Sequence, residues 1–167
     1  MTISRPPARW TFMEGKEVYM EGVSHYILFS LAGTTYAVPS GLVQQMDMVG
    51  QITPVPNAPP SVEGVIFLRG QVIPVVNLRV RFGFPRVPYD LKTRLIVIRQ
   101  DGRSVGLIVD TAREFVTIPD EAIQPPPEGI TDLSGRYLSG IARLDNRLVL
   151  ILDGHDVIDP ASMKAIA

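Results

Sequence analysis

One stretch of the sequence occurs twice, and this repeat restricts the fold more than any other feature. Residues 64–78 align without a gap on residues 140–154. Each copy has a glycine, an apolar run, a polar turn, a second apolar run and then an Asn or Asp residue. Two short apolar runs that flank a tight polar turn are typical of a β-hairpin. The chain is therefore predicted to contain the same hairpin twice.

An earlier pair of segments is also similar. Residues 26–38 resemble residues 95–107, and each segment has a strand, a turn at a glycine and a returning strand. The repeats divide the chain into two units, roughly residues 24–83 and 92–158. Each unit has about five short strands with glycine turns, a pattern that favours a small β-barrel. We predict an all-β fold that arose by internal duplication, with a groove between the barrels lined by the linker near Pro85 and the two hairpins.

The first hairpin carries three local signals. Arg69-Gly70 lies between the apolar runs, and glycine tolerates the positive φ of a tight two-residue turn. Pro74 cannot donate to a sheet ladder, so the second strand is predicted to be an edge strand or to be broken there. Asn77 has the chemistry of an N-cap for a short helical turn over residues 78–82.

The two ends of the chain differ from the repeated part. Residues 1–22 contain prolines, glycines and mixed charges, and we predict a flexible N-terminal arm, with a docked extra strand as the alternative. Residues 159–167 are predicted to form a C-terminal tail or a short helix, because Asp159-Pro160 suits a helix start.

Composition excludes several classes of protein. The 16 basic and 17 acidic residues give a net charge of −1, which provides no electrostatic footprint for nucleic acid or an anionic membrane. No apolar run approaches the ~20 residues that a membrane span needs, and the N-terminus lacks the apolar core of a signal peptide. The sequence has no cysteine, which excludes disulfides and thiolate chemistry. A cytoplasmic, bacterial-type domain is expected.

The chemistry of an enzyme is not visible in the sequence. His25 and His155 are the only histidines, and neither lies in a metalloprotease-type motif. Residues 153–156 could hold a metal, but a helix-capping, solvated turn is favoured there. The sequence also contains no nucleotide-binding loop and no nucleophile motif. We therefore predict a binding module without catalytic activity, cofactor or metal.

Three motifs with fixed spacing occur along the chain: Gly64-Val-x-x-Leu68-Arg69-Gly70-x-x-x-Pro74-x-x-x-Leu78-Arg79-x-x-Phe82, Val105-Gly106-x-x-Val109-Asp110 and Ile123-x-Pro125-x-Pro127. Together they resemble the CheW family, the adaptor proteins of bacterial chemosensory arrays. The resemblance covers roughly residues 24–158. It implies two five-stranded SH3-like or OB-like β-barrels that share a core and carry short helical turns.

The resemblance also implies partners. Family members join the cytoplasmic tip of methyl-accepting chemoreceptors to a CheA-type histidine kinase, whose homologous regulatory domain associates with the adaptor barrel to barrel. The receptor tip lies in the groove between the barrels. For this chain the resemblance implies a cytoplasmic protein that is recruited to membrane-associated receptor arrays, does not insert into the membrane, binds no nucleic acid, and is a monomer or self-associates weakly.

Candidate partner-binding residues are carried over from the family by position. Val43 and Arg69 match positions implicated in receptor or array function, and Asn77 and Arg79 match a feature after the first hairpin. The neighbours of these matches complete the candidate set: Leu42, Gly64 and Gly70. Plain structural roles stay open for several of them, because Arg69 could be a solvated turn arginine, Val43 a core valine and Asn77 a helix cap.

The chain departs from the family pattern in one region. Pro39-Ser40-Gly41 replaces a more helical, charged sequence, and Gln45 stands where an acidic residue is common. An adaptor of a chemosensory system that controls pili or gliding is therefore an alternative. A barrel that binds single-stranded nucleic acid or a small ligand is less favoured, because the net charge is near zero and the chain has one tryptophan.

Overall fold

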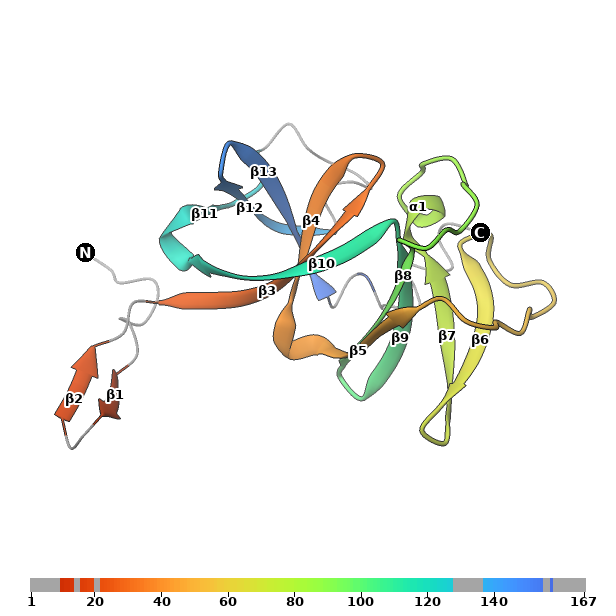
Figure 1. The fold of residues 1–167 in the computed structure, drawn as a ribbon, viewed down its shortest axis with the longest axis horizontal. Coiled ribbons are helices and arrows are strands. Elements are labelled where there is room, and N and C mark those ends of the chain that lie inside the picture. The colour runs from red at the N-terminus through yellow and green to blue at the C-terminus, as the bar shows by residue number, and fades with distance from the viewer. Residues whose placement is uncertain (1–9, 14–15, 20–21, 128–136, 155–156, 158–167) are drawn as a thin grey trace.

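The structure is a computed structural model that describes residues 10–13, 16–19, 22–127, 137–154 and 157. The described residues form a nearly all-β protein built on two large sheets, as predicted (Figure 1). The first sheet has six strands in the order β10 (Thr111–Pro119), β3 (Val23–Leu31), β4 (Thr34–Pro39), β13 (Arg147–Leu152), β12 (Leu138–Leu144) and β11 (Ile123–Gln124). The second has five in the order β5 (Val43–Met48), β8 (Arg94–Gln100), β9 (Arg103–Val109), β7 (Gln71–Asn77) and β6 (Val62–Leu68). The helical turns are η1 (Ser40–Leu42), α1 (Leu78–Arg81) and η2 (Asp120–Ala122).

Each sheet combines strands from both halves of the sequence. The β3–β4 hairpin of the first half lies between β10 and β13 of the second half. In the same way, the β8–β9 hairpin lies between β5 and β7 of the first half. The prediction of one barrel from residues 24–83 and another from residues 92–158 is therefore wrong in its assignment of strands. Sequence repeats reveal local hairpins, whereas long-range packing selects the partners of each hairpin.

The duplication itself is visible in the strand register. Val75 pairs with Gly106 in the parallel β7–β9 ladder, and Ile151 pairs with Ala37 in the parallel β13–β4 ladder. These two pairs are equivalent in the sequence repeats. The irregularities of register also recur at equivalent positions: Val62/Gly64 and Leu138/Gly140 in the repeated hairpins, and Val43/Gln45 and Ala112/Glu114 in β5 and β10. The predicted pair of equivalent hairpins is confirmed.

The two sheets share one core and each has a smaller core of its own. The shared cluster takes buried residues from both sheets, including Phe29 of β3 and Ile96 of β8. Successive residues of β3 point to opposite faces of the strand. Leu28 packs in the cluster of the six-stranded sheet, and Phe29 packs in the shared cluster. Both faces of this strand are buried, as its apolar sequence predicts.

The local signals in the first hairpin are largely confirmed. Asn77 caps α1, and its Oδ1 accepts hydrogen bonds from the backbone N–H groups of Arg79 and Val80. β7 is an interior strand of its sheet, but its pairing with β9 covers only residues 75–77. At Pro74 the neighbouring strand among the described residues is β6, so the missing N–H interrupts no second ladder.

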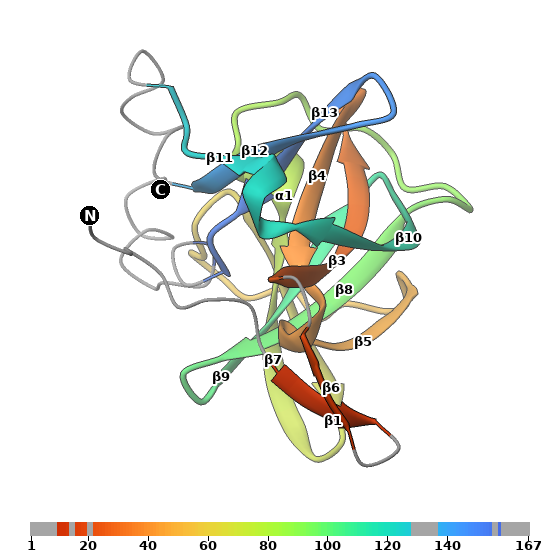
Figure 2. The same ribbon diagram turned by 90° about the vertical axis from the view of Figure 1, so that its left-hand side faces the viewer.

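The ends of the chain are described only in part. β1 (Trp10–Met13) and β2 (Lys16–Tyr19) pair with each other as an antiparallel hairpin and with no other strand of the described residues. Figure 1 shows this hairpin projecting away from the two sheets, and in the view of Figure 2 it lies toward the viewer. A docked extra strand is therefore not observed, and the flexibility of the arm stays a prediction. The predicted tail, residues 159–167, lies outside the described residues.

Candidate functional site

Leu42 and Val43 lie where η1 passes into β5, an edge strand of the five-stranded sheet. Both residues are partly buried and pack against the shared core. Val43 pairs with Ile98 of β8, and the register then shifts before Gln45. The core interpretation of Val43 is thus correct as far as its packing goes, while its position on an edge strand leaves part of it accessible to a partner.

Arg69 and Gly70 form the tip of the β6–β7 hairpin, as predicted. Their φ angles are +51° and +80°, so both central residues of the turn have the positive φ that a type I′ turn requires. The Arg69 side chain is exposed and makes no ion pair or hydrogen bond among the described residues. It lines a small depression together with Gln44 and Gln45 of β5, so the hairpin tip lies beside the edge strand.

Gly64 has a structural role that the sequence did not reveal. It is buried with a φ of +147°, and a Cβ at this position would lie 2.1 Å from the carbonyl oxygen of Thr53. Thr53 and Val65 exchange two backbone hydrogen bonds of 2.9 Å each. The absent side chain of Gly64 therefore allows the segment around Thr53 to pair against β6.

Asn77 and Arg79 lie at the opposite end of the hairpin from Arg69 and are engaged within the molecule. Asn77 is 2% exposed, and its Nδ2 donates to Glu63 Oε2 at 3.0 Å. Arg79 donates to both carboxylate oxygens of Asp110, at 2.8 and 2.9 Å, and to the carbonyl oxygen of Pro85 at 2.9 Å. Asp110 Oδ2 also accepts from the backbone N–H of Ala32 at 2.9 Å.

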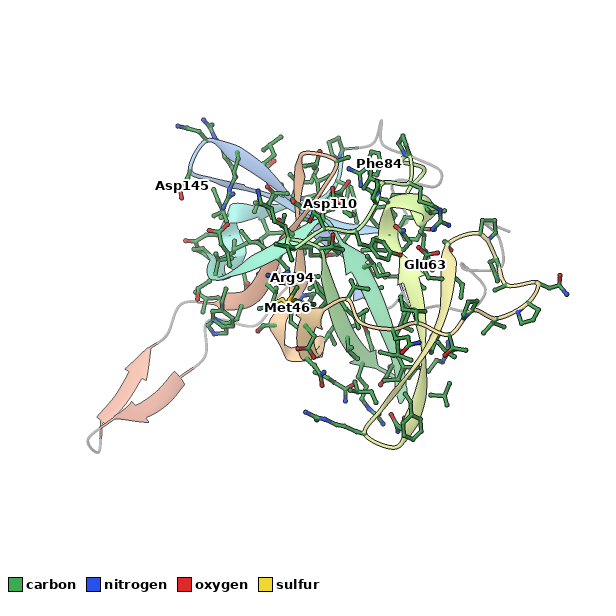
Figure 3. The ribbon with its side chains drawn as sticks, turned by 45° about the vertical axis from the view of Figure 1, so that its right-hand side comes forward. Met46, Glu63, Phe84, Arg94, Asp110 and Asp145 are labelled. Atoms are coloured by element: carbon green, nitrogen blue, oxygen red, sulfur yellow. The ribbon has the colours of Figure 1, made fainter. Side chains whose placement is uncertain are left out.

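These contacts fix the start of the linker between the two halves of the chain, at Pro85, against α1 and the residue after β9. The Arg79–Asp110 pair joins α1, the residue after β9, the β3–β4 turn and Pro85. Figure 3 labels Asp110. A bidentate arginine–carboxylate pair of this kind is among the stronger charge-assisted interactions in proteins. Asp110 is the last residue of the motif Val105-Gly106-x-x-Val109-Asp110. Arg79, which pairs with it, was expected to contact a partner protein instead.

Glu63 binds the same linker farther along, at Arg86 and Tyr89. Its carboxylate accepts hydrogen bonds from Arg86 Nη1, at 2.5 and 2.7 Å, from Asn77 Nδ2 and from the hydroxyl of Tyr89. Burial alone would raise the pKa of Glu63, but the hydrogen bonds from Arg86, Tyr89 and Asn77 outweigh it and the pKa lies below its usual value. Burial and the Glu63 carboxylate together raise the pKa of the Tyr89 hydroxyl.

The depressed pKa of Glu63 predicts a pH-dependent contribution to stability. We expect Glu63→Gln to lower the free energy of unfolding by about 1–2 kcal/mol at neutral pH, because charged hydrogen bonds are lost. A carboxylate whose pKa is lower in the folded state stabilises above the unfolded value of about 4.3, and the effect disappears as the pH falls through the folded value. The difference between the wild type and Glu63→Gln should therefore shrink in urea titrations below about pH 4.

Glu114→Gln is the matched control for this prediction. Glu114 makes an ion pair with Arg147 at 2.9 Å, but both side chains are more than 40% exposed. Exposed pairs contribute roughly 0–1 kcal/mol, so this variant should change stability little at any pH. Equal losses in the two variants would contradict the assigned role of Glu63.

An apolar pocket of about 300 Å³ lies between the six-stranded sheet and the segment formed by α1 and the residues that follow it. Phe82, Gly83 and Phe84 line it on one side, next to the linker, and Leu150 and Leu152 of β13 line it on the other. Of the predicted lining, the second hairpin contributes to this pocket through β12 and β13, whereas Pro85 is not among its described lining residues. The first hairpin contributes none of the described lining residues.

Exposed apolar side chains gather on the strands outside this pocket. Met46 and Met48 are exposed on β5, and Phe115 is exposed on β10. Met46 and Phe115 occupy equivalent positions in the two repeats. Phe115 stacks on His25 with ring centroids 5.7 Å apart. A further exposed pair, Phe67 and Val72, lies directly across the β6–β7 ladder near Arg69. Composition alone did not predict these surfaces.

The described part of the chain contains no group of three or more His, Cys, Asp or Glu residues arranged for a metal ion. Part of the candidate cluster at residues 153–156 lies outside the described residues. None of the helices that the structure describes is long and apolar enough to cross a membrane.

Comparison with known proteins identifies the family. The family of CheW-like domains matches residues 25–161. The chain is 34% identical over 139 residues to the chemotaxis protein CheW of Bacillus subtilis, covering 83% of this chain and 89% of that protein. It is 30% identical over 141 residues to CheW of Klebsiella aerogenes, covering 84% and 85%. Protein FrzA of Myxococcus xanthus is 27% identical over 144 residues, covering 85% and 89%.

A solved structure agrees with this match. The scaffolding protein TtCheW from Thermoanaerobacter tengcongensis superposes with a TM-score of 0.77 at 31% identity, covering 86% of this chain and 96% of that one. The family match includes both sheets and all seven candidate residues, while the β1–β2 hairpin lies outside it. The chain therefore belongs to the CheW family of chemotaxis scaffold proteins.

Proposed function

We propose that this chain is a non-catalytic adaptor that couples the cytoplasmic tips of methyl-accepting chemoreceptors to the regulatory domain of a CheA-type histidine kinase. In this proposal the protein is cytoplasmic, is recruited to membrane-associated receptor arrays, and acts without a cofactor. The observation that carries the proposal is the family match over both sheets, with relatives that are named chemotaxis proteins.

The surface of the molecule supports two protein partners. Exposed apolar residues lie on β5 and β10, and a second set surrounds the tip of the β6–β7 hairpin. Protein interfaces are enriched in exposed Phe, Met and Arg, which are residue types found on these surfaces. More than one exposed surface suits an adaptor, because each partner needs a place of its own.

Binding to purified partners tests the proposal. A chemoreceptor cytoplasmic fragment and a kinase regulatory domain from the same bacterium would each be titrated against the full chain by calorimetry. We expect both to bind, and a mixture of all three to form one complex in size-exclusion chromatography. A chain that binds neither protein under low-salt conditions would contradict the coupling role.

Arg69 is the candidate residue whose side chain is free to act in binding. We expect Arg69→Ala to leave the free energy of unfolding within about 0.5 kcal/mol of the wild type, as for ordinary surface changes. The backbone strain at φ +51° is shared by arginine and alanine, so it should not change. We also expect association with receptor or kinase to weaken by about 1–3 kcal/mol, the effect of a modest hot spot.

Arg143→Ala is the control for this experiment. Arg143 lies near the tip of the equivalent β12–β13 hairpin, and among the described residues its side chain makes one long hydrogen bond, of 3.4 Å to Asn146. Its removal should change neither stability nor binding. If Arg69→Ala binds both partners as the wild type does, Arg69 is a solvated turn residue. A large loss of stability would make it structural.

A chemosensory system with another output, such as pili or gliding, is the second candidate. The observation that favours it is the neutral Gln45 on β5 beside Arg69, where family members commonly have an acidic residue. Deletion of the gene, followed by swimming and surface-motility assays, would distinguish the outputs. Loss of swimming alone would exclude this second candidate.

A further inference from the structure

Three exposed arginines of the five-stranded sheet have no side-chain partner among the described residues: Arg69, Arg99 and Arg103. The first two are connected with each other. Arg69 lies at the tip of the β6–β7 hairpin, and Arg99 lies near the end of β8. Neither guanidinium makes a hydrogen bond, ion pair or ring contact to another described residue. Exposed arginines are common, so their positions relative to each other decide whether they form a site.

A chain of contacts connects the two arginines across one end of the sheet. Arg69 lines a depression with Gln44 and Gln45. Ser104 Oγ donates to Gln44 Oε1 at 3.0 Å, and Ser104 lies directly opposite Arg99 in the β8–β9 ladder. Residues directly opposite each other in an antiparallel ladder point to the same face. We call this group the cationic mouth: Gln44, Gln45, Arg69, Arg99 and Ser104.

The mouth holds two cations without a neutralising carboxylate among its members. The described residues around Arg69 are the two glutamines, Leu68, Gln71 and Ile73. The nearest acidic residue along β5 is Asp47, which accepts a hydrogen bond from Gln45 Nε2. The turn between β8 and β9 also carries Asp101, which has an interaction of its own.

The internal duplication provides a built-in comparison. The positions of Gln45 and Gln71 correspond to Glu114 and Arg147 in the six-stranded sheet, where these residues form an ion pair at 2.9 Å. The counterpart of Arg69 is Asp145, at the tip of the β12–β13 hairpin (Figure 3). The same fold therefore forms one end with an internal ion pair and the other with unpaired cations, so the fold does not require the cationic mouth.

We propose that the cationic mouth binds carboxylates from an acidic segment of a protein partner. This inference rests on the proposed function, and it specifies the chemistry that one partner surface must have at this end of the adaptor. The arginine guanidinium can donate two parallel hydrogen bonds to a carboxylate. Two such groups at one end of the sheet suit two acidic side chains. A nucleic acid is a poorer match, because the whole chain has a net charge of −1.

The sharpest test adds the missing carboxylate. Gln45→Glu places an acidic group at the position that Glu114 has in the other sheet, and in this sheet the arginine that lines the same depression is Arg69. We expect this variant to bind the receptor fragment or the kinase regulatory domain about tenfold more weakly, because the partner loses an arginine that is now paired. Arg69→Glu and Arg99→Glu should reduce the same association by about tenfold or more.

Arg103→Glu is the matched control. Arg103 is exposed at the start of β9. It pairs with Gln100, one position along from the Arg99–Ser104 pair, and so lies on the other face. It changes the net charge by the same amount as Arg69→Glu. In a buffer of about 0.15 M salt, which screens long-range charge effects, we expect Arg103→Glu to bind the same partner within about twofold of the wild type. Circular dichroism would verify that each variant is folded.

A second probe separates this inference from the proposed function. A short fluorescent oligoglutamate peptide should bind the wild type weakly, and the double variant Arg69→Glu/Arg99→Glu should lose this binding while Arg103→Glu retains it. If receptor and kinase do not bind but the peptide does, the coupling role fails and the cationic mouth stands. If all variants bind partners and peptide as the wild type does, or if a DNA oligonucleotide binds more tightly than the peptide, the inference is overturned.

Discussion

Replacement of Gly64 by alanine should destabilise the protein by about 3 kcal/mol or more, the range of the severe single substitutions. Two costs act together at this position. The φ of +147° is unfavourable for any residue with a Cβ, and the added Cβ would lie 2.1 Å from the Thr53 carbonyl oxygen. A backbone atom cannot move aside without breaking the two Thr53–Val65 hydrogen bonds. Urea denaturation followed by circular dichroism would measure the loss.

Gly70→Ala separates the two costs. Gly70 has a φ of +80°, but a Cβ there would contact nothing within 4 Å. Only the conformational cost of about 1–2 kcal/mol should therefore appear. If Gly64→Ala costs no more than Gly70→Ala, the close approach of Thr53 to β6 does not hold in solution.

The hairpins were predictable because their signals are local. The turn at Arg69-Gly70 follows from a short polar pair between apolar runs, and the cap on α1 follows from an Asn residue before a helical segment. The burial of both faces of β3 was also visible, because both of its faces are apolar in the sequence. These features need only neighbouring residues, which the sequence places in order.

The arrangement of the hairpins was not predictable in the same way. The repeats indicate that β3 and β8 are equivalent, but they do not show which half of the chain supplies the flanking strands. An exchanged and an unexchanged arrangement contain the same hairpins and bury the same apolar residues. The parallel ladders β4–β13 and β7–β9 decide between them, and both join residues far apart in the sequence.

The candidate site was predictable to a similar extent. Arg69 was expected at an exposed tip, and it lies there. Arg79 was expected to meet a partner protein, but its guanidinium contacts Asp110 and Pro85. Glu63 and Tyr89 were not singled out at all, although Glu63 binds the linker at Tyr89. Contacts of this kind depend on the path of the linker, which has no periodic pattern to reveal it.

The exchange of strands predicts that neither half of the chain folds alone. Fragments that end at Val87 and begin at Pro88 would divide the chain in the linker, where both residues are exposed. The first fragment would then present β3 and β4 without β10 and β13, and the second would present β8 and β9 without β5 and β7. Each fragment would also expose its part of the shared core to water.

We expect each isolated fragment to lack a cooperative unfolding transition and to show little near-ultraviolet circular dichroism. Co-expressed fragments should instead purify together and unfold cooperatively, because the four exchanged pairings and the shared core re-form without the peptide bond at residue 87. Two barrels that were each built from one half would give the opposite result, with both fragments folded when alone. Such independent folding, measured as a full urea transition in either fragment, would contradict the exchanged topology.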